Sequence, residues 1–207
     1  MDVTSLPSDW PFREAGRRVL QGAHRWWVCD IGAKDAPSVL LLHGLGASGH
    51  SFRNLIPVLA PHYRLIIPDL PGHGGTKTAN RTRIALGPIA QDLSQLCHVF
   101  GVEPIAVVGH SAGAAIALEM ATRTSDLKVV GINAALEHFD GAASLLFPVL
   151  AQGLAALPFA GQLFSKLWGS QRKVRQLLEG TGSTLDDAGV AQYVHLVQSS
   201  AHIKGAL

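Results

Sequence analysis

Three short apolar runs, each followed by a glycine-rich polar stretch, constrain the fold of this chain most strongly. The runs are 38–42, 63–68 and 105–108. Because apolar residues dominate these runs, they are typical of strands buried on both faces of a parallel sheet. Apolar residues at helical spacing follow each run, over 52–59, 84–100 and 112–122. This order predicts a doubly wound, mostly parallel α/β sheet with functional loops at the carboxyl ends of its strands.

Two further strands are expected in the same sheet. Residues 25–30 are aromatic and β-prone, and residues 129–132 form another short apolar run. After about Glu137 the pattern predicts helices alone. We therefore expect the N-terminal part of an α/β core over residues 1–137 and an incomplete helical cap or lid over residues 138–207.

The composition excludes several classes of function. Of the 207 residues 47% are hydrophobic, and the formal net charge is +2. That charge is too small for a nucleic-acid-binding surface. Cys29 and Cys97 show neither metal-ligand nor disulfide spacing, and the first residues lack the order of a signal peptide. We expect a cytoplasmic protein without a bound metal or cofactor, because no motif for either is present.

One segment tests that expectation. Residues 144–168 are almost wholly apolar and nominally long enough to span a bilayer. Pro148 and Pro158 interrupt the segment, and an internal proline breaks a helix. The sequence therefore favours two short cap helices that meet near Pro158, with a membrane span and weak contact of this segment to a membrane surface as the alternatives.

The stretch 107–115 carries the clearest chemical signal. It reads V-V-G-H-S-A-G-A-A, a G-x-S-x-G pattern between an expected strand and an expected helix. This is the context of a nucleophile elbow, in which Gly109 and Gly113 relieve crowding at a sharp turn. We predict that Ser111 is a nucleophile at the N-terminus of a helix, where developing negative charge is favoured. A serine that merely caps the helix is the alternative.

An acyl-transfer site also needs two donors for an oxyanion. The N–H of Ala112 is the first candidate, since it follows the nucleophile. The second donor is expected in the H-G-L-G loop after the first buried strand. We choose the N–H of Leu45, and Gly44 and Gly46 stay open as alternatives.

Together these residues resemble the α/β-hydrolase fold family. The resemblance rests on L-L-L-H-G-L-G-A-S, I-I-P-D-L-P-G-H-G and V-V-G-H-S-A-G-A-A at their present intervals, and it covers residues 24–137 well. A narrower similarity comes from D-W-P-F-R-E-A near the N-terminus and from G-I-N-A-A-L. Both look like the magnesium-chelatase accessory proteins of bacteriochlorophyll biosynthesis. That resemblance implies a role in the synthesis of photosynthetic pigments. It also implies an association with magnesium chelatase, and a substrate that is a tetrapyrrole intermediate or its ester.

The family pattern also implies a triad of Ser, then Asp or Glu, then His, with the last two after later strands. No buried strand is expected after Ile132, so we expect a truncated chain whose acid and base lie beyond Leu207. Alternatives within the chain stay open. They are His138, His195 and His202 as the base, and Glu137 or Asp69 as the acid.

Three residues near these motifs are expected to have structural roles. His43 is expected to order its loop, His110 to neighbour the site without being its base, and Asp69 to hold the turn at 71–74.

The sequence thus predicts a serine hydrolase whose substrate is a small hydrophobic molecule, either an ester or a related carbonyl compound. Two alternatives are a carbon–carbon bond hydrolase, which uses the same parts, and a non-catalytic accessory or tetrapyrrole-binding protein that retains the elbow. The sequence determines neither the exact substrate nor the oligomeric state.

Overall fold

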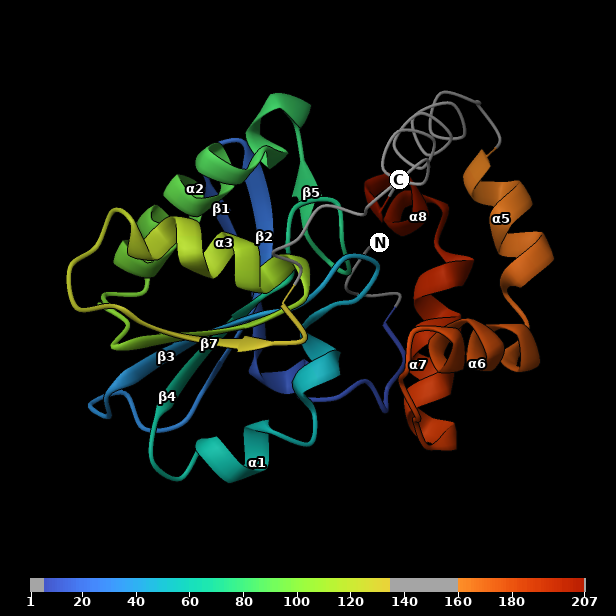
Figure 1. Cartoon of the computed structure of the whole chain (residues 1–207), viewed down its shortest axis with the longest axis horizontal. Helices are drawn as coiled ribbons and strands as arrows, with labels where there is room; N and C mark the ends of the chain where they lie inside the picture. Colours follow the sequence, from blue (N-terminus) through green and yellow to red (C-terminus); the bar gives the residue numbers. More distant parts are fainter. Residues whose placement is uncertain (1–5, 135–159, 207) are drawn as a thin grey trace. The chain divides into compact units, whose positions relative to one another are not determined.

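The computed structural model describes residues 6–134 and 160–206. The chain divides into two compact units, one within Asp2–Leu136 and the other within Glu137–Leu207. Figure 1 colours both along the sequence. The first unit is an α/β layer structure and the second is helical, and each is described here by itself.

A seven-stranded mixed sheet forms the centre of the first unit. Its order is β1-β2-β4-β3-β6-β7, and β5 also pairs with β2. The strands β3, β4, β6 and β7 are parallel, whereas β2 runs antiparallel to β1, β4 and β5. The bounds are β1 Gly16–Gln21, β2 His24–Ile31, β3 Ser38–Leu42, β4 Arg64–Pro68, β5 Lys77–Thr78, β6 Ala106–His110 and β7 Lys128–Ile132.

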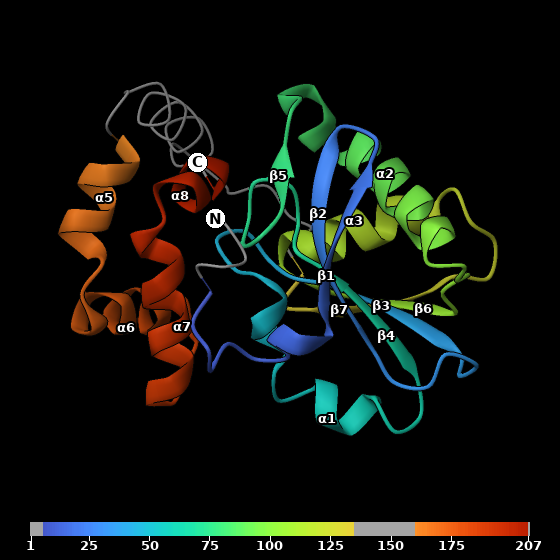
Figure 2. The same ribbon diagram turned by 180° about the vertical axis from the view of Figure 1, so that it is seen from behind.

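Helices cover both faces of this sheet. Figure 1 and the reverse view in Figure 2 show α2 and α3 on one face and α1 on the other. Their bounds are α1 Ile56–Leu59, α2 Leu86–Val99 and α3 Ala112–Ala121. Short 3-10 helices at Arg13–Ala15, Gly49–Phe52 and Arg81–Ile84 complete the unit.

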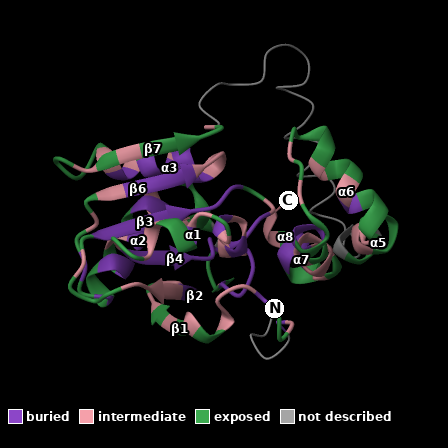
Figure 3. Cartoon of the chain, turned by 90° about the horizontal axis from the view of Figure 1, so that it is seen from below, coloured by how far each residue is buried: buried purple, intermediate pink, exposed green. Residues whose placement is uncertain are grey.

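The pleat of each strand divides the core into two apolar clusters. On β3, Leu40 and Leu42 belong to the cluster under α2 and α3, whereas Val39 and Leu41 belong to the cluster under α1. Successive side chains of a strand point to opposite faces, so a continuously apolar strand serves both clusters. Figure 3 shows the result: β3, β4 and β6 are mostly buried, while β7 at the edge is mostly exposed.

The expected buried strands are confirmed, and two expected helices are shorter than predicted. The helix expected over 52–59 is a 3-10 turn followed by the single turn of α1, and the one expected over 84–100 begins only at Leu86. Proline explains both starts. Pro57 and Pro88 lie in the first turns of α1 and α2, where a proline ring is tolerated because no intrahelical N–H is needed.

The second unit contains four described helices. They are α5 Ala160–Trp168, α6 Gln171–Gly180, α7 Asp187–Gln198 and α8 Ser200–Ala206. The Asp186 side chain caps α7 by accepting a hydrogen bond from the Gly189 N–H at 2.8 Å. Of the apolar segment 144–168, only α5 lies among the described residues, and it begins after Pro158. None of the helices described is both long and apolar enough to cross a membrane.

Two cysteines lie on opposite sides of the sheet. Cys97 on α2 is part of the cluster under α2 and α3, and Cys29 on β2 packs against the cluster under α1. Neither forms a disulfide. Burial raises the pKa of each thiol to about 12, so both remain protonated at neutral pH.

A buried ionic network joins the first hairpin to α2. His24 is fully buried, and its Nε2 lies 3.0 Å from an Asp92 carboxylate oxygen. Arg83 forms two hydrogen bonds with the same carboxylate. The network therefore anchors the start of β2 to the middle of α2, with the charge of Asp92 balanced by Arg83.

This network predicts a pH dependence of stability. Burial lowers the pKa of His24 below its usual 6.5, more strongly than Asp92 raises it. Protonation therefore favours the unfolded chain, and stability that is complete above about pH 6.5 is lost as the pH falls. We expect His24→Gln to flatten the rise in the free energy of unfolding between about pH 5.5 and about pH 7.5, measured by urea titration.

The flattening is expected to be partial. His73 and His110 also have lowered pKa values through burial, and they remain in the variant. The Asp69 carboxyl, whose pKa is raised, acts in the opposite direction equally in both proteins. An unchanged pH profile for His24→Gln would show that His24 does not titrate in this range.

Candidate active site

Ser111 occupies a strained turn between β6 and α3. Its backbone angles are φ 51° and ψ −117°, a region that residues with a side chain rarely adopt. The Ser111 N–H donates to the Ile132 carbonyl of β7 at 3.0 Å, which fixes the turn to the neighbouring strand. Strain of this kind is found where a side chain must be presented at a functional position. Ser111 as a whole is half-buried.

Glycine is required on both sides of the turn. A Cβ on Gly109 would lie 2.4 Å from the Gly113 carbonyl oxygen, and one on Gly113 would lie 2.1 Å from the Leu42 carbonyl oxygen. These distances are far shorter than any real contact of a Cβ, and the opposing atoms are backbone. The two glycines therefore let α3 start directly against β3 and β6.

The loop after β3 lies against Ser111. A Cβ on Gly44 would be 3.1 Å from the Ser111 Cβ and 2.9 Å from the His110 Nδ1. Among the described residues, neither the Leu45 N–H nor the Ala112 N–H has a hydrogen-bond acceptor. The Gly44 N–H has none either, so Gly44 stays an alternative to Leu45. Two loops thus bring unused backbone donors to the neighbourhood of one hydroxyl.

His43 orders the loop after β3, as the sequence predicts. Its ring is fully buried, and both ring nitrogens have partners. Nδ1 donates to the Gly44 carbonyl at 2.8 Å, and Nε2 accepts from the Leu70 N–H at 2.8 Å. These partners require the neutral ring with its proton on Nδ1. His43 therefore connects the loop after β3 to the loop after β4 and presents no ring nitrogen to a substrate.

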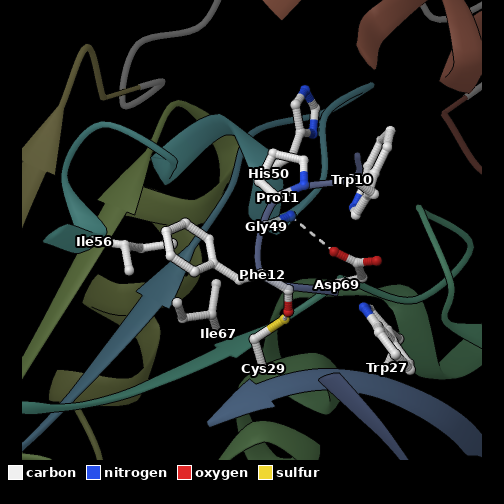
Figure 4. A pocket seen from close by; sticks show the side chains of 10 residues that line it. All are labelled: Trp10, Pro11, Phe12, Trp27, Cys29, Gly49, His50, Ile56, Ile67 and Asp69. Carbon is white, nitrogen blue, oxygen red and sulfur yellow. Dashed lines mark hydrogen bonds between the residues drawn. The ribbon is translucent and has the colours of Figure 1, made fainter. Parts of the chain in front are cut away.

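Asp69 also connects the loop after β3 to the loop after β4. One carboxylate oxygen accepts from the Gly49 N–H at 2.7 Å and the other from the Gly75 N–H at 2.8 Å. Figure 4 shows Asp69 facing Gly49 beside Trp10 and His50. Burial raises the pKa of Asp69 to about 6, against the opposing effect of these two donors. Both oxygens accept from backbone N–H groups, so Asp69 has the expected turn-holding role, and among the described residues no histidine hydrogen-bonds to its carboxylate.

The cavity drawn in Figure 4 is not a substrate pocket. Its volume is about 10 Å³, and aromatic side chains from the N-terminal segment and β2 close it. A space of that size holds about one water molecule.

Asp69→Ala is expected to lower the free energy of unfolding by about 2–5 kcal/mol, because it leaves two buried N–H groups without an acceptor. Urea unfolding at neutral pH measures this loss. Asp35 is exposed and provides the control, since Asp35→Ala is expected to change stability by about 0.5 kcal/mol or less. Equal stabilities of the two variants would contradict the role given to Asp69.

His110 lies beside the site without acting on Ser111. Burial lowers its pKa, and its Nδ1 is buried against the backbone of Gly44. Among the residues that the structure describes, no histidine hydrogen-bonds to the Ser111 hydroxyl. His110 is therefore a neighbour of the elbow, as expected.

None of the other candidates for a base or an acid belongs to the unit that contains Ser111. Glu137 and His138 lie outside the described residues. His195 lies on α7 and His202 on α8, in the second unit. The sequence missed the roles of Gly49, Gly75 and Leu70, whose N–H groups hold the loops. Only the glycine spacing around Asp69 hints at them.

Comparison with known proteins identifies the fold family. A model of the alpha/beta hydrolase fold family matches residues 37–177. The chain belongs to this family. It is 52% identical over all 207 residues to the magnesium-chelatase 30 kDa subunit of Rhodobacter capsulatus, of which it covers 73%. The similarity confirms the narrower resemblance read from the sequence.

More distant members share less of the chain. An uncharacterized hydrolase of Saccharomyces cerevisiae is 32% identical over 125 residues, which are 58% of this chain and 43% of that protein. The solved epoxide hydrolase CorEH has a TM-score of 0.71 at 22% identity and matches 92% of this chain and 70% of its own. Cfl2 of Burkholderia cenocepacia has a TM-score of 0.67 at 19% identity, over 87% of this chain and 65% of its own. These two structures support the hydrolase fold.

Proposed function

We propose that this member of the alpha/beta hydrolase family is a serine hydrolase acting on an ester or related carbonyl compound. The observation that carries the proposal is the backbone of Ser111, which is held at φ 51° between β6 and α3. A serine without a chemical role has no reason to be kept in this conformation when glycine or a relaxed turn would serve. The adjoining unused N–H groups of Leu45 and Ala112 support it.

In the proposed reaction, the Ser111 hydroxyl oxygen attacks the substrate carbonyl carbon while a histidine takes the hydroxyl proton. The carbonyl oxygen becomes an oxyanion that accepts hydrogen bonds from the Leu45 and Ala112 N–H groups. Collapse expels the alcohol, which takes that proton, and water then releases the acid by the same steps. We propose that the histidine and its carboxylate partner come from the protein chain beyond Leu207.

Covalent labelling tests the nucleophile. A fluorophosphonate probe is expected to modify Ser111 in the protein expressed from its complete reading frame, with the modified peptide identified by mass spectrometry. Ser94 on α2, whose hydroxyl donates to the Ala90 carbonyl, serves as a comparison. Labelling is expected to persist in Ser94→Ala and to disappear in Ser111→Ala. A folded wild-type protein that resists the probe would count against the proposal.

Gly44→Ala tests the loop that holds the second donor. The new Cβ meets His110 and Ser111 at 2.9 and 3.1 Å and has to push the loop away from the elbow. We expect the labelling rate to fall by about 10²–10³-fold, the usual loss when one oxyanion donor is displaced. Gly180→Ala adds a methyl group into open space on α6 and is the control. Equal labelling rates for both variants would exclude this loop from the oxyanion site.

The similarity to the magnesium-chelatase 30 kDa subunit favours a second candidate function. In this second candidate function, the protein is a non-catalytic accessory that associates with magnesium chelatase or binds a tetrapyrrole intermediate. Complementation of a deletion strain distinguishes the two, because Ser111→Ala is expected to fail for a hydrolase and to succeed for an accessory protein. A carbon–carbon bond hydrolase uses the same site and is distinguished from an esterase only by its substrate.

Contact with a membrane surface is a separate proposal for the second unit. At the end of α5, Leu167 and Trp168 are 49% and 37% exposed, and Lys166 beside them is exposed as well. Apolar and basic side chains together suit an interfacial surface. Co-sedimentation with anionic liposomes, compared between wild type and Trp168→Ser, tests it.

A further inference from the structure

A cleft at the antiparallel end of the sheet is lined by two cations directly opposite each other. Arg25 on β2 pairs with Leu20 on β1 on one side and with Lys77 on β5 on the other. Figures 1 and 2 show β5 beside β2. Residues paired in register carry their side chains to the same face, so these three form one row. The cleft has a volume of about 320 Å³.

The two cations in this row have no acidic partner among the described residues. All three side chains are exposed, with Leu20 at 78%. Within the described part of the chain, neither Arg25 nor Lys77 forms an ion pair or a side-chain hydrogen bond. Like charges directly opposite on a sheet destabilise it. The sheet thus carries a local excess of positive charge that no part of the described fold compensates.

The strand beneath the row is firmly held. On the opposite face of β2, His24 binds the Asp92 carboxylate, and the Trp26 Nε1 donates to the Gln21 side chain at 3.0 Å. Both side chains are fully buried. The backbone that carries Arg25 is therefore fixed before any ligand arrives, which reduces the ordering cost of binding.

We propose that this cleft binds an amphipathic anion, whose carboxylate or phosphate lies between Arg25 and Lys77 and whose apolar chain lies on Leu20. The planar guanidinium suits two oxygens of one anionic group, and the ammonium adds a point charge. The volume is within the range of small-molecule sites. A nucleic acid would need more phosphate-binding cations than this row offers. The site shares no residue with the Ser111 machinery, so either proposal can fail alone.

An NMR titration tests the site on the ¹⁵N-labelled protein. Octyl phosphate and octanoate are the two probes, and the tighter one identifies the head group. We expect saturable shifts confined to the amides of residues 20–25 and 77–79. Arg25→Gln/Lys77→Gln is expected to weaken binding by about tenfold or more, since two charged contacts are lost. Lys128→Gln/Arg172→Gln removes the same charge from exposed positions elsewhere and is expected to bind as the wild type does.

Three results would overturn the inference. The first is the absence of saturable shifts at these amides up to the solubility limit of both probes. The second is equal binding by the Arg25→Gln/Lys77→Gln variant, whose unchanged spectrum elsewhere shows that it is folded. The third is equal affinity for inorganic phosphate or for neutral octyl glucoside, since either would remove one half of the amphipathic ligand.

Discussion

Ser111→Ala is expected to reduce the turnover of p-nitrophenyl esters by about 10⁴-fold or more, the loss typical of removing a serine nucleophile. The substitution deletes one oxygen of a half-buried residue and leaves the elbow, the helix and the loop after β3 in place. Residual turnover above the rate in water is still expected, because the backbone donors remain. Initial rates of the complete protein measure the effect, and the fold is checked by circular dichroism. Turnover near the wild-type level would remove Ser111 from the reaction.

Ser111→Gly separates strain from chemistry. Glycine adopts a positive φ without steric cost, so the strain at φ 51° is relieved. Relief of about 1–3 kcal/mol, reduced by the backbone freedom that glycine gains in the unfolded chain, leaves an expected net stabilisation of about 1 kcal/mol. The same variant is expected to be as inactive as Ser111→Ala. A more stable but inactive protein would show that stability is given up at this residue for function.

Gly113→Ala is expected to lower the free energy of unfolding by about 3 kcal/mol or more. The added Cβ meets the Leu42 carbonyl oxygen at 2.1 Å and the His43 carbonyl oxygen at 2.7 Å. Neither atom belongs to a flexible side chain, so α3 has to move away from β3, and the contact between the elbow and the loop after β3 is lost with it. Urea unfolding measures the change.

The control for this variant is again Gly180→Ala. Gly180 ends α6 and has open space around its Cα. Alanine favours a helix over glycine, so the control is not expected to lose stability. Equal free energies of unfolding for Gly113→Ala and Gly180→Ala would contradict the close approach of α3 to β3.

The parallel strands could be predicted from the sequence because their pattern is local. In runs such as 38–42 the four residues after Ser38 are all apolar, and such a run is typical of a strand buried on both faces. The strand β1 was missed because it lies at the edge of the sheet and contains Arg17 and Arg18. Of its residues, only Val19 packs against the core cluster under α2 and α3. An edge strand needs few apolar residues, and such a pattern is indistinguishable from a loop.

In the candidate site, too, the sequence predicts local features but not contacts between distant residues. The elbow is encoded within five consecutive residues, so its glycines and serine were found directly. The contacts that hold the loops join residues far apart in the chain, such as His43 with Leu70 or Asp69 with Gly49. The network of His24, Asp92 and Arg83 was missed for the same reason, since a buried acid in the middle of α2 follows no local pattern. Pairings of this kind depend on the register of the sheet.

The two cysteines provide a way to observe the two layers of the fold separately. Each thiol is protonated in the native protein, and the two lie on different sides of the sheet, Cys97 buried and Cys29 half-buried. Alkylation of Cys97 therefore requires the layer under α2 and α3 to open, whereas alkylation of Cys29 requires movement of the N-terminal segment, whose Phe12 carbonyl accepts a hydrogen bond from the Cys29 thiol. The ratio of the two modification rates, measured peptide by peptide, compares movement of the N-terminal segment with opening of the core layer without any engineered label.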